Sequence, residues 1–217
     1  MGLKAICLVL VCLALPACSG KTDYIRPSSQ PPLSNSITFN KSKDDAWKEI
    51  VPALGKNFYV INNIDKSSGL INISYTGDPE TYIDCGRGSS YVKNLKGERT
   101  YEFPAARANQ VYEVMEGGVL YFIDRKVNLE GRMNLIFEDL GPLQTKITAN
   151  TRYVVTRTST FQQAGTAGTA TRSDSIAFNT GQQASFPRSS SQHTVECQAN
   201  GKFESDVLNL FMGGGTK

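Results

Sequence analysis

A regular alternation of apolar and polar residues between residues 125 and 160 constrains the fold more than any other feature of the sequence. The apolar positions share one parity in each of two runs: Val127, Leu129, Met133, Leu135 and Phe137, then Ile147, Ala149, Thr151, Tyr153 and Val155. Successive side chains of a β-strand point to opposite faces, so this period indicates two strands that each bury one face. Residues 139–142, Asp-Leu-Gly-Pro, supply a turn between them. We therefore predict a long antiparallel β-hairpin.

The opposite face of this hairpin is polar. Its residues are Arg132, Asn134, Lys146, Thr148, Asn150, Arg152 and Thr156. Such faces are usually only solvated, since much of any protein surface serves no partner. The alternative is a dedicated binding face, in which Arg132 and Arg152 are the candidate contacts with a ligand or a protein partner.

The preceding residues predict a strand and a helix. Residues 36–40 alternate as in a short strand, and Ser42 is placed to cap a helix that has Asp44 and Asp45 in its first turn. Apolar side chains then recur at helical spacing: Ala46, Trp47, Ile50, Val51, Leu54 and Phe58. Pro52 lies inside this pattern and should kink or shorten the helix, because it removes a backbone donor.

Two more strands and a second helix complete the predicted fold. Residues 58–64 and 70–75 alternate and flank a turn-forming stretch at 65–69, which predicts a hairpin. Near the end of the chain, residues 203–211 place their apolar side chains largely on one side of a helix. We predict an α+β fold for a single domain, residues 36–217. A curved antiparallel sheet would be packed by two helices in a helix-grip-like arrangement with a long β-hairpin extension.

This order of strand, helix and hairpin resembles the helix-grip domains of the BamC lipoproteins. The resemblance rests on Trp47, Leu54, Phe58, Val60, Asp65, Gly69, Ile71 and Tyr75. BamC lipoproteins are accessory subunits of the β-barrel assembly machinery in the bacterial outer membrane, so the resemblance implies a role in an envelope assembly. They have two such domains, whereas this chain has one followed by a long β-rich continuation. Common core residue types carry the likeness, so it bears on fold more than on function.

The first residues resemble the export signal of bacterial lipoproteins. An apolar run from Ala5 to Ala14 is too short to span a bilayer, and it ends in a lipobox-like Leu15-Pro16-Ala17-Cys18. Pro16 departs from the usual pattern. The resemblance implies that residues 1–17 are removed as a signal peptide and that Cys18 carries fatty acyl chains such as palmitate. By the family's sorting pattern, Ser19 implies the periplasmic face of the outer membrane. The alternative is an ordinary secretory signal that releases a soluble periplasmic protein.

Several segments lack a strong structural pattern. Residues 18–35 are rich in Ser and Pro, which predicts an extended, mobile, lipidated tether. Residues 86–97 have the composition of a polar loop. Residues 162–192 are mostly small and polar and predict a long mobile loop, or alternatively a segment that orders on a partner. Residues 105–123 are ambiguous between a helix and strands, and Gly117-Gly118 favours a hairpin.

Two cysteines remain after the signal and Cys18 are set aside. Cys85 and Cys197 form an even pair in an oxidising compartment, so we predict a disulfide bond between them. The alternative makes Cys85 a reactive thiol, which needs a positive or basic neighbour to hold a thiolate. The sequence offers only Arg87 nearby.

Charge and motifs exclude several classes of function. Without Lys4, the chain has 22 basic and 20 acidic residues, a net charge of about +2, and its basic residues are dispersed. This pattern indicates no nucleic-acid partner. No nucleophile elbow, zinc-binding helix or phosphate loop is present, and His193 is the single histidine. We therefore expect no enzyme activity, no metal and no cofactor.

Two functional hypotheses remain. In the first, the protein is anchored to the membrane by its N-terminal lipid and acts as a binding or scaffold module for a protein partner in the cell envelope. In the second, it carries a lipid or another apolar ligand between helix and sheet, near Trp47 and Phe58. The sequence favours no particular oligomeric state.

Overall fold

The computed structural model describes residues 18–28, 34–57, 59–187 and 193–212. In these ranges the chain is mostly antiparallel β-sheet with two helices, which confirms the predicted α+β class. The elements are β1 (Ser19–Ile25), β2 (Ser36–Phe39), α1 (Lys43–Lys56), β3 (Val60–Asp65), β4 (Leu70–Gly77), the 3-10 turn η1 (Pro79–Thr81), β5 (Ile83–Asp84), β6 (Arg87–Asn94), β7 (Gly97–Pro104), β8 (Asn109–Glu116), β9 (Val119–Gly141), β10 (Gln144–Gln163), β11 (Thr169–Asn179), β12 (Gln183–Ser185), β13 (Glu196–Ala199) and α2 (Lys202–Met212).

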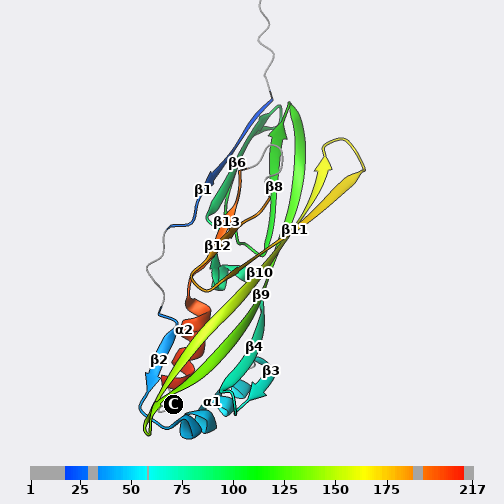
Figure 1. The fold of residues 1–217 in the computed structure, drawn as a ribbon. Helices are drawn as coiled ribbons and strands as arrows, with labels where there is room; N and C mark the ends of the chain where they lie inside the picture. Colours follow the sequence, from blue (N-terminus) through cyan, green and yellow to red (C-terminus); the bar gives the residue numbers. More distant parts are fainter. Residues whose placement is uncertain (1–17, 29–33, 58, 188–192, 213–217) are drawn as a thin grey trace, which may run out of the picture.

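The long antiparallel strands β9 and β10 form a spine along the molecule (Figure 1). Each of their neighbours covers only part of this spine. On β9, residues 129–136 pair with β4 and residues 119–126 pair with β8. On β10, residues 145–148 pair with β2 and residues 152–162 pair with β11. The sheet therefore has a lower half, β2-β10-β9-β4-β3, and an upper half, β11-β10-β9-β8.

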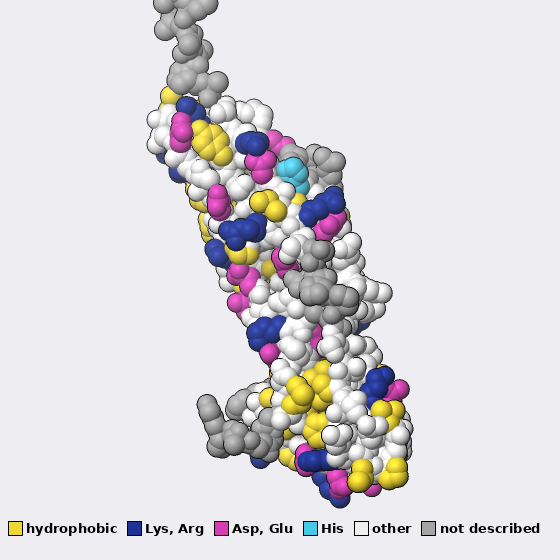
Figure 2. All heavy atoms as spheres, turned by 90° about the vertical axis from the view of Figure 1, so that its left-hand side faces the viewer, with side chains coloured by type: hydrophobic (Ala, Val, Ile, Leu, Met, Phe, Trp, Pro, Cys, Tyr) yellow, Lys and Arg dark blue, Asp and Glu magenta, His cyan; other side chains and the backbone are white. Residues whose placement is uncertain are grey.

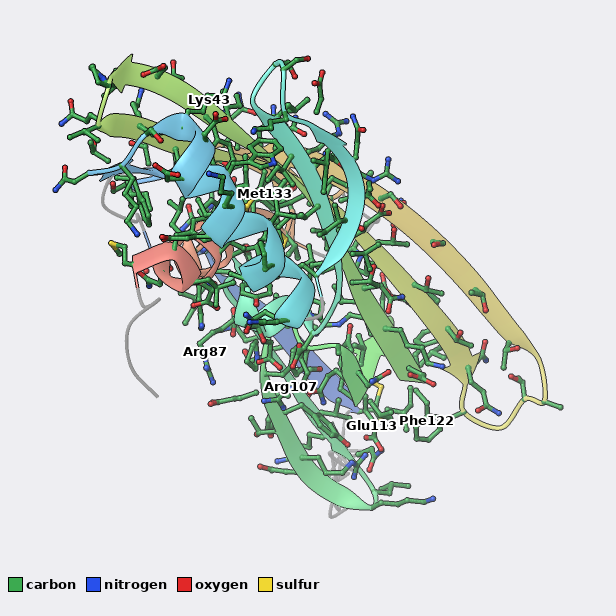
Figure 3. All side chains as sticks on the ribbon, turned by 90° about the horizontal axis from the view of Figure 1, so that it is seen from below. Lys43, Arg87, Arg107, Glu113, Phe122 and Met133 are labelled. Carbon is green, nitrogen blue, oxygen red and sulfur yellow. A yellow bond between two sulfur atoms is a disulfide. The ribbon has the colours of Figure 1, made fainter. Side chains whose placement is uncertain are left out.

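Both helices pack on one face of the lower half, and Figure 3 shows α1 lying across the sheet at Met133. Of the predicted apolar stripe, Ala46, Trp47, Ile50 and Leu54 are buried, Val51 is half-buried and Phe58 lies outside the described residues. The Trp47 ring lies 5.0 Å from the ring of Phe137 on β9. The helix runs past Pro52 to Lys56, so the expected shortening does not occur. Packing of an apolar face outweighs the loss of one backbone hydrogen bond.

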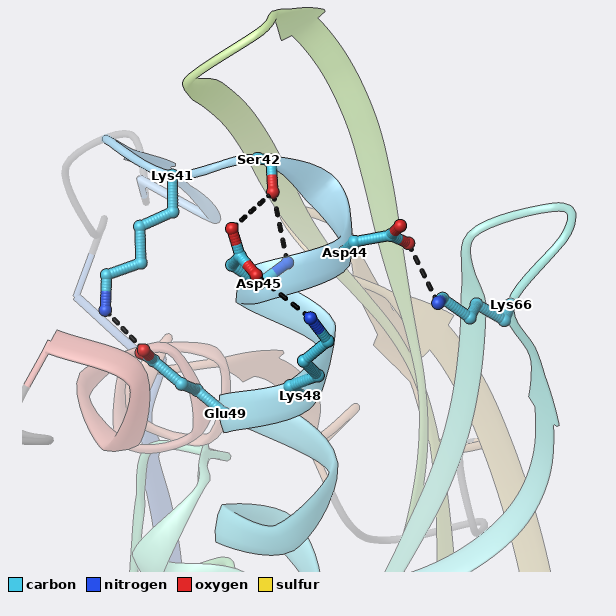
Figure 4. A network of polar contacts seen from close by, with 7 residues as sticks. All are labelled: Lys41, Ser42, Asp44, Asp45, Lys48, Glu49 and Lys66. Atoms are coloured by element: carbon cyan, nitrogen blue, oxygen red, sulfur yellow. Dashed lines mark hydrogen bonds and ion pairs between the residues drawn. The ribbon is translucent and has the colours of Figure 1, made fainter.

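Polar contacts fix the start of α1 (Figure 4). The Ser42 hydroxyl accepts a hydrogen bond from the backbone N–H of Asp45 at 3.2 Å, as the capping pattern predicts. The Asp44 carboxylate pairs at 2.8 Å with Lys66 in the turn between β3 and β4. The hydrogen bond from Lys66 lowers the pKa of Asp44. This exposed pair adds little stability, but it joins the helix to the hairpin.

A second layer covers the upper half. Strands β1, β6 and β7 form a three-stranded antiparallel sheet that lies against β8 and the adjoining parts of β9 and β10. Its small core joins Phe103 of β7, Tyr112 and Val114 of β8 and Ile123 of β9. The described residues thus form two hydrophobic cores, a large one that includes the packing of the helices on the sheet and a small one between two sheets.

The tether prediction for residues 18–35 is corrected over Ser19–Ile25. These residues form β1, which pairs with β6 along its full length. The Tyr24 hydroxyl donates to the carbonyl of Cys85 at 3.0 Å and accepts from the N–H of Glu196 at 2.9 Å. The segment has few apolar side chains, but main-chain pairing holds it, and composition does not report main-chain pairing. Residues 29–33 lie outside the described residues.

The mobile-loop prediction for residues 162–192 is also corrected. Within this segment, residues 169–179 form β11 and residues 183–185 form β12. Hydroxyl pairs join β10 to β11, namely Thr156–Ser175, Thr158–Ser173 and Thr160–Thr171 at 2.8 to 3.1 Å. Residues 188–192 lie outside the described residues. The expected polar loop at 86–97 is likewise mostly strand β6, which pairs with β7.

The predicted disulfide is present. Cys85, just after β5, is bonded to Cys197 of β13, and both are buried. The bond joins residues 112 positions apart in the sequence. It therefore links the C-terminal part of the chain covalently to the segment after β5, where β13 pairs with both β5 and β12.

Candidate functional site

In the described part of the chain, the sheet face opposite the helices is polar, and asparagines form a row across it. Asn72 of β4, Asn134 of β9 and Asn150 of β10 lie opposite one another in register. Asn72 donates to the side-chain oxygen of Asn134 at 2.6 Å. At the two ends, Asn62 donates to Asn72 at 2.8 Å and Asn35 donates to Asn150 at 3.0 Å. We call these five asparagines the amide row.

The middle of the amide row keeps free hydrogen-bonding capacity. Asn134 and Asn150 each accept a bond through the side-chain oxygen. Their NH2 groups make no hydrogen bond to another described residue and are exposed. An amide has two N–H donors, so this pair offers up to four donors to an incoming acceptor.

Two arginines lie next to the amide row. Arg132 of β9 and Arg152 of β10 are directly opposite each other, one step along the face from Asn134 and Asn150. Arg132 is paired with Glu130 at 2.6 Å. The described residues include every aspartate and glutamate of the sequence, and none lies within 4.0 Å of the Arg152 guanidinium. Like charges directly opposite each other destabilise a sheet, so this pair favours an incoming negative group.

The two arginines and three members of the amide row, Asn72, Asn134 and Asn150, line one open hollow of about 550 Å³. Thr151, Asn179 and Thr180 complete its lining. Thr180, one of the lining residues, connects the hollow to the core. The Thr180 hydroxyl donates at 2.7 Å to the carboxylate of Glu204, which lies on α2 and is only 1% exposed. The hollow is thus set on a fixed frame of strands and one buried polar contact.

This arrangement suits binding rather than bond-breaking chemistry. Guanidinium and amide groups offer donors to carboxylate and carbonyl oxygens. The described residues lining the hollow include no Ser, Cys, His or Lys, and the lining hydroxyl that bonds a carboxylate, that of Thr180, is directed to the buried Glu204. In the described ranges, no group of three or more His, Cys, Asp or Glu side chains is placed to hold a metal ion.

The structure separates the four candidate contact residues. Arg132 and Arg152 come together at the hollow. Trp47 is a core residue, 8% exposed, and packs on Phe137. Phe58 lies outside the described residues. Of the other polar-face residues, Lys146 is paired with Glu138 at 3.1 Å and lies away from the hollow.

Sequence reasoning missed part of the amide row. Asn72 alternates with the buried Ile71 and Ile73, so its parity already placed it on the polar face of its strand. The missing information was the register between β4 and β9, which aligns Asn72 with Asn134. Charge distribution gives no further guide. Figure 2 shows basic and acidic side chains interspersed along one side of the molecule.

Comparisons with protein-family models, with curated proteins and with solved structures find no match. Among the described residues, neither helix is long and apolar enough to cross a membrane. Cys18 is described, and its thiol is exposed and outside the disulfide. Residues 15–17, the rest of the lipobox-like motif, lie outside the described residues.

Proposed function

We propose that this protein is an outer-membrane lipoprotein, anchored through Cys18, that serves as a binding or scaffold module in a cell-envelope assembly. Its contact surface is the hollow lined by Asn72, Asn134, Asn150, Arg132 and Arg152. One observation carries the proposal. Arg132 and Arg152 lie directly opposite each other on the sheet face away from both helices, beside side-chain NH2 groups of asparagines that make no hydrogen bond to another described residue. A surface that presents donors and positive charge without matching acceptors is suited to a partner that brings them.

The proposed occupant is a segment of a protein partner that carries at least one carboxylate. A carboxylate matches the guanidinium of Arg152 bidentately, and carbonyl oxygens of the segment would accept from Asn134 and Asn150. The helix-grip relationship to BamC lipoproteins belongs to the same proposal. Its support is the packing of α1 and α2 on one face of an antiparallel sheet.

Site-specific crosslinking in intact envelopes tests the contact surface. A photoreactive residue at Asn134 should capture one defined protein, and the Arg132→Glu, Arg152→Glu double variant should lose that capture. The matched control is Arg87→Glu, Arg107→Glu, which changes the charge equally at exposed positions elsewhere, labelled in Figure 3. Equal capture by both double variants would contradict the assignment of the surface.

Fatty-acid labelling tests the anchor separately. Cells fed a clickable fatty acid should label the wild-type protein and leave Cys18→Ser unlabelled. Labelling of neither protein would reject the lipoprotein assignment and leave the crosslinking result standing on its own.

The carrier hypothesis requires room for a ligand between helix and sheet near Trp47. The side chains of α1 that face the sheet are themselves packed, with Ala46, Ile50 and Leu54 at most 1% exposed. No observation on the described residues favours a ligand there, so we do not propose this function.

A further inference from the structure

A second cavity lies between the two sheets of the upper half, away from the proposed contact surface. Its volume is about 60 Å³. β1 and β6 contribute lining residues from one side, and β9 and β10 contribute Arg125 and Arg157 from the other. Apolar side chains such as Phe103, Ala105 and Val195 form part of its wall, and polar groups form the rest. A cavity of this size has room for a few water molecules or one compact polar group.

Arg125 is a buried cation without a carboxylate partner. It is 6% exposed, and its guanidinium makes a single hydrogen bond to another described residue, from Nη2 to the carbonyl of Pro104 at 3.2 Å. Its Nε is buried and has no hydrogen-bond partner in the described ranges. The described residues hold all the acidic side chains of the sequence, and none lies within 4.0 Å of this guanidinium.

Contact with the Phe103 ring only partly offsets the free-energy cost of burying the Arg125 guanidinium. The Arg125 guanidinium lies over the Phe103 ring, 4.8 Å from its centroid. Burial lowers the pKa of Arg125, and the nearby Arg157 lowers it further. Arginine nonetheless keeps its proton in proteins, so the buried charge persists. Buried charges are otherwise paired, because an unpaired one loses its hydration without replacement.

Arg157 increases the positive charge at the same cavity. It lies on β10 two residues from Ser159, the register partner of Arg125, so the two arginines are diagonal neighbours on one face. Arg157 is paired with Asp174 at 3.3 Å, but Asp174 is also bound by Arg172 at 3.0 Å. Arg157 and Arg172 thus share one aspartate, while Arg125 has no acidic side chain of the described residues within 4.0 Å.

The remaining lining favours an anion. The hydroxyls of Ser89, Ser159 and Tyr112 line the cavity and make no hydrogen bond to another described residue. Asp23 is the only acid in the lining; it is half exposed and already paired with Lys21 at 2.8 Å. The cavity therefore combines positive charge, free donors and room for one small group.

We propose that this cavity binds a compact oxyanion, that is, a single carboxylate, sulfate or phosphate group. The guanidinium of Arg125 holds it bidentately, with Arg157 and the neighbouring hydroxyls as further donors. The site is too small for a nucleotide or a sugar phosphate to enter whole. This inference does not depend on the proposed envelope function.

Thermal unfolding of the disulfide-intact protein in phosphate, sulfate or acetate, at constant ionic strength, tests the site. The Tm of the wild type should rise by roughly 5 °C as the best anion reaches a hundredfold excess over its Kd. The three anions distinguish a carboxylate site from a site for tetrahedral oxyanions. A Tm that shows no saturable response to any of them would overturn the proposal.

Variants test whether the rise in Tm with anion concentration comes from this cavity. Arg125→Met should fold, because it removes an unpaired buried charge, and it should lose the anion response. Arg87→Met is the control, since it removes an exposed arginine that does not line the cavity; it should keep the response. Arg125→Lys keeps the charge without the bidentate fork and should bind at least about tenfold more weakly by calorimetry. Binding unchanged in Arg125→Lys, or a response retained in Arg125→Met, would contradict the assignment.

Discussion

The hydroxyl of Tyr153 donates a hydrogen bond of 2.7 Å to the carboxylate of Glu204, and both residues are buried. Tyr153 lies on β10 and Glu204 on α2, so this bond joins the second helix to the spine of the sheet. No Lys, Arg or His among the described residues lies within 4.0 Å of the Glu204 carboxylate. The carboxylate depends instead on two hydroxyls, those of Tyr153 and Thr180.

Removing the Tyr153 hydroxyl should therefore be costly. We expect Tyr153→Phe to lower the free energy of unfolding by about 1–3 kcal/mol, because it leaves one oxygen of a buried carboxylate unsatisfied. Urea denaturation at pH 7 measures the change. Tyr121→Phe is the control, since the Tyr121 hydroxyl makes no hydrogen bond to another described residue. Equal losses in both variants would show that the bond to Glu204 is not the cause.

Buried tyrosines should also make the fold sensitive to alkali. Burial is the main cause that raises the pKa of Tyr153, and it also raises the pKa of Tyr24, Tyr59 and Tyr112. A raised pKa means that the folded state keeps its proton at a pH where the unfolded state loses it. This stability is fully present below the unfolded pKa of about 10 and is lost as pH rises above it.

We expect the free energy of unfolding to be level between pH 8 and about pH 9.5 with respect to these groups and to fall beyond about pH 10. Urea denaturation at stepped pH values measures the slope. In Tyr153→Phe the slope above pH 10 should be shallower by about one proton. An unchanged slope would mean that Tyr153 titrates alike in the folded and unfolded chains.

Gly131 allows Phe203 to approach the spine. A Cβ on Gly131 would lie 3.0 Å from the Phe203 ring. We expect Gly131→Val to destabilise the protein by about 1–3 kcal/mol through overpacking. Combining it with Phe203→Leu should recover part of that loss, and a double-mutant cycle of urea denaturation measures the coupling. Strict additivity of the two changes would argue that the two positions do not compete for space.

The disulfide should contribute strongly to stability. It closes a loop across 112 positions, for which chain entropy predicts about 4–5 kcal/mol. In a Cys18→Ser background, reduction should lower the free energy of unfolding by that amount. Reductant should have no effect on a Cys85→Ala, Cys197→Ala variant, which serves as the control. Stability that is unaffected by reduction would indicate that the unfolded chain is already compact without the bond.

Trp47 reports on the carrier hypothesis. Because its ring packs against Phe137 in the core, we expect added phospholipid vesicles to leave Trp47 fluorescence unchanged. It is the single tryptophan of the sequence, so the signal is unambiguous. Saturable quenching by lipids with brominated chains would instead show that apolar ligands reach the space between helix and sheet.

Periodicity predicted the parts of the fold that bury one face regularly. The hairpins and α1 follow directly from it, because their apolar residues recur at every second position or at helical spacing. Periodicity did not predict strands β1 and β11, because main-chain pairing and hydroxyl pairs hold them in place of a regular apolar face. The composition of both segments is typical of loops.

The two sites differ in how much the sequence revealed. Arg132 and Arg152 were recognised on the polar face, but the amide row required the register of separate strands. Arg125 shares the parity of the buried Val127 and Leu129, and a charged residue at a core position was a visible sign of an unusual environment. Its lack of a carboxylate partner depends on contacts between distant strands, which the sequence alone does not specify.

The early start of β1 affects how a lipidated protein would stand on a membrane. Ser19 already pairs with Lys93 of β6, one residue after Cys18. A lipid on Cys18 would then be attached almost directly to one end of the spine, with the turn between β9 and β10 at the far end (Figure 1). Such a short link would keep that end of the molecule close to the bilayer. The length of the strands between that end and the hollow would then limit how far the hollow could lie from the lipid surface.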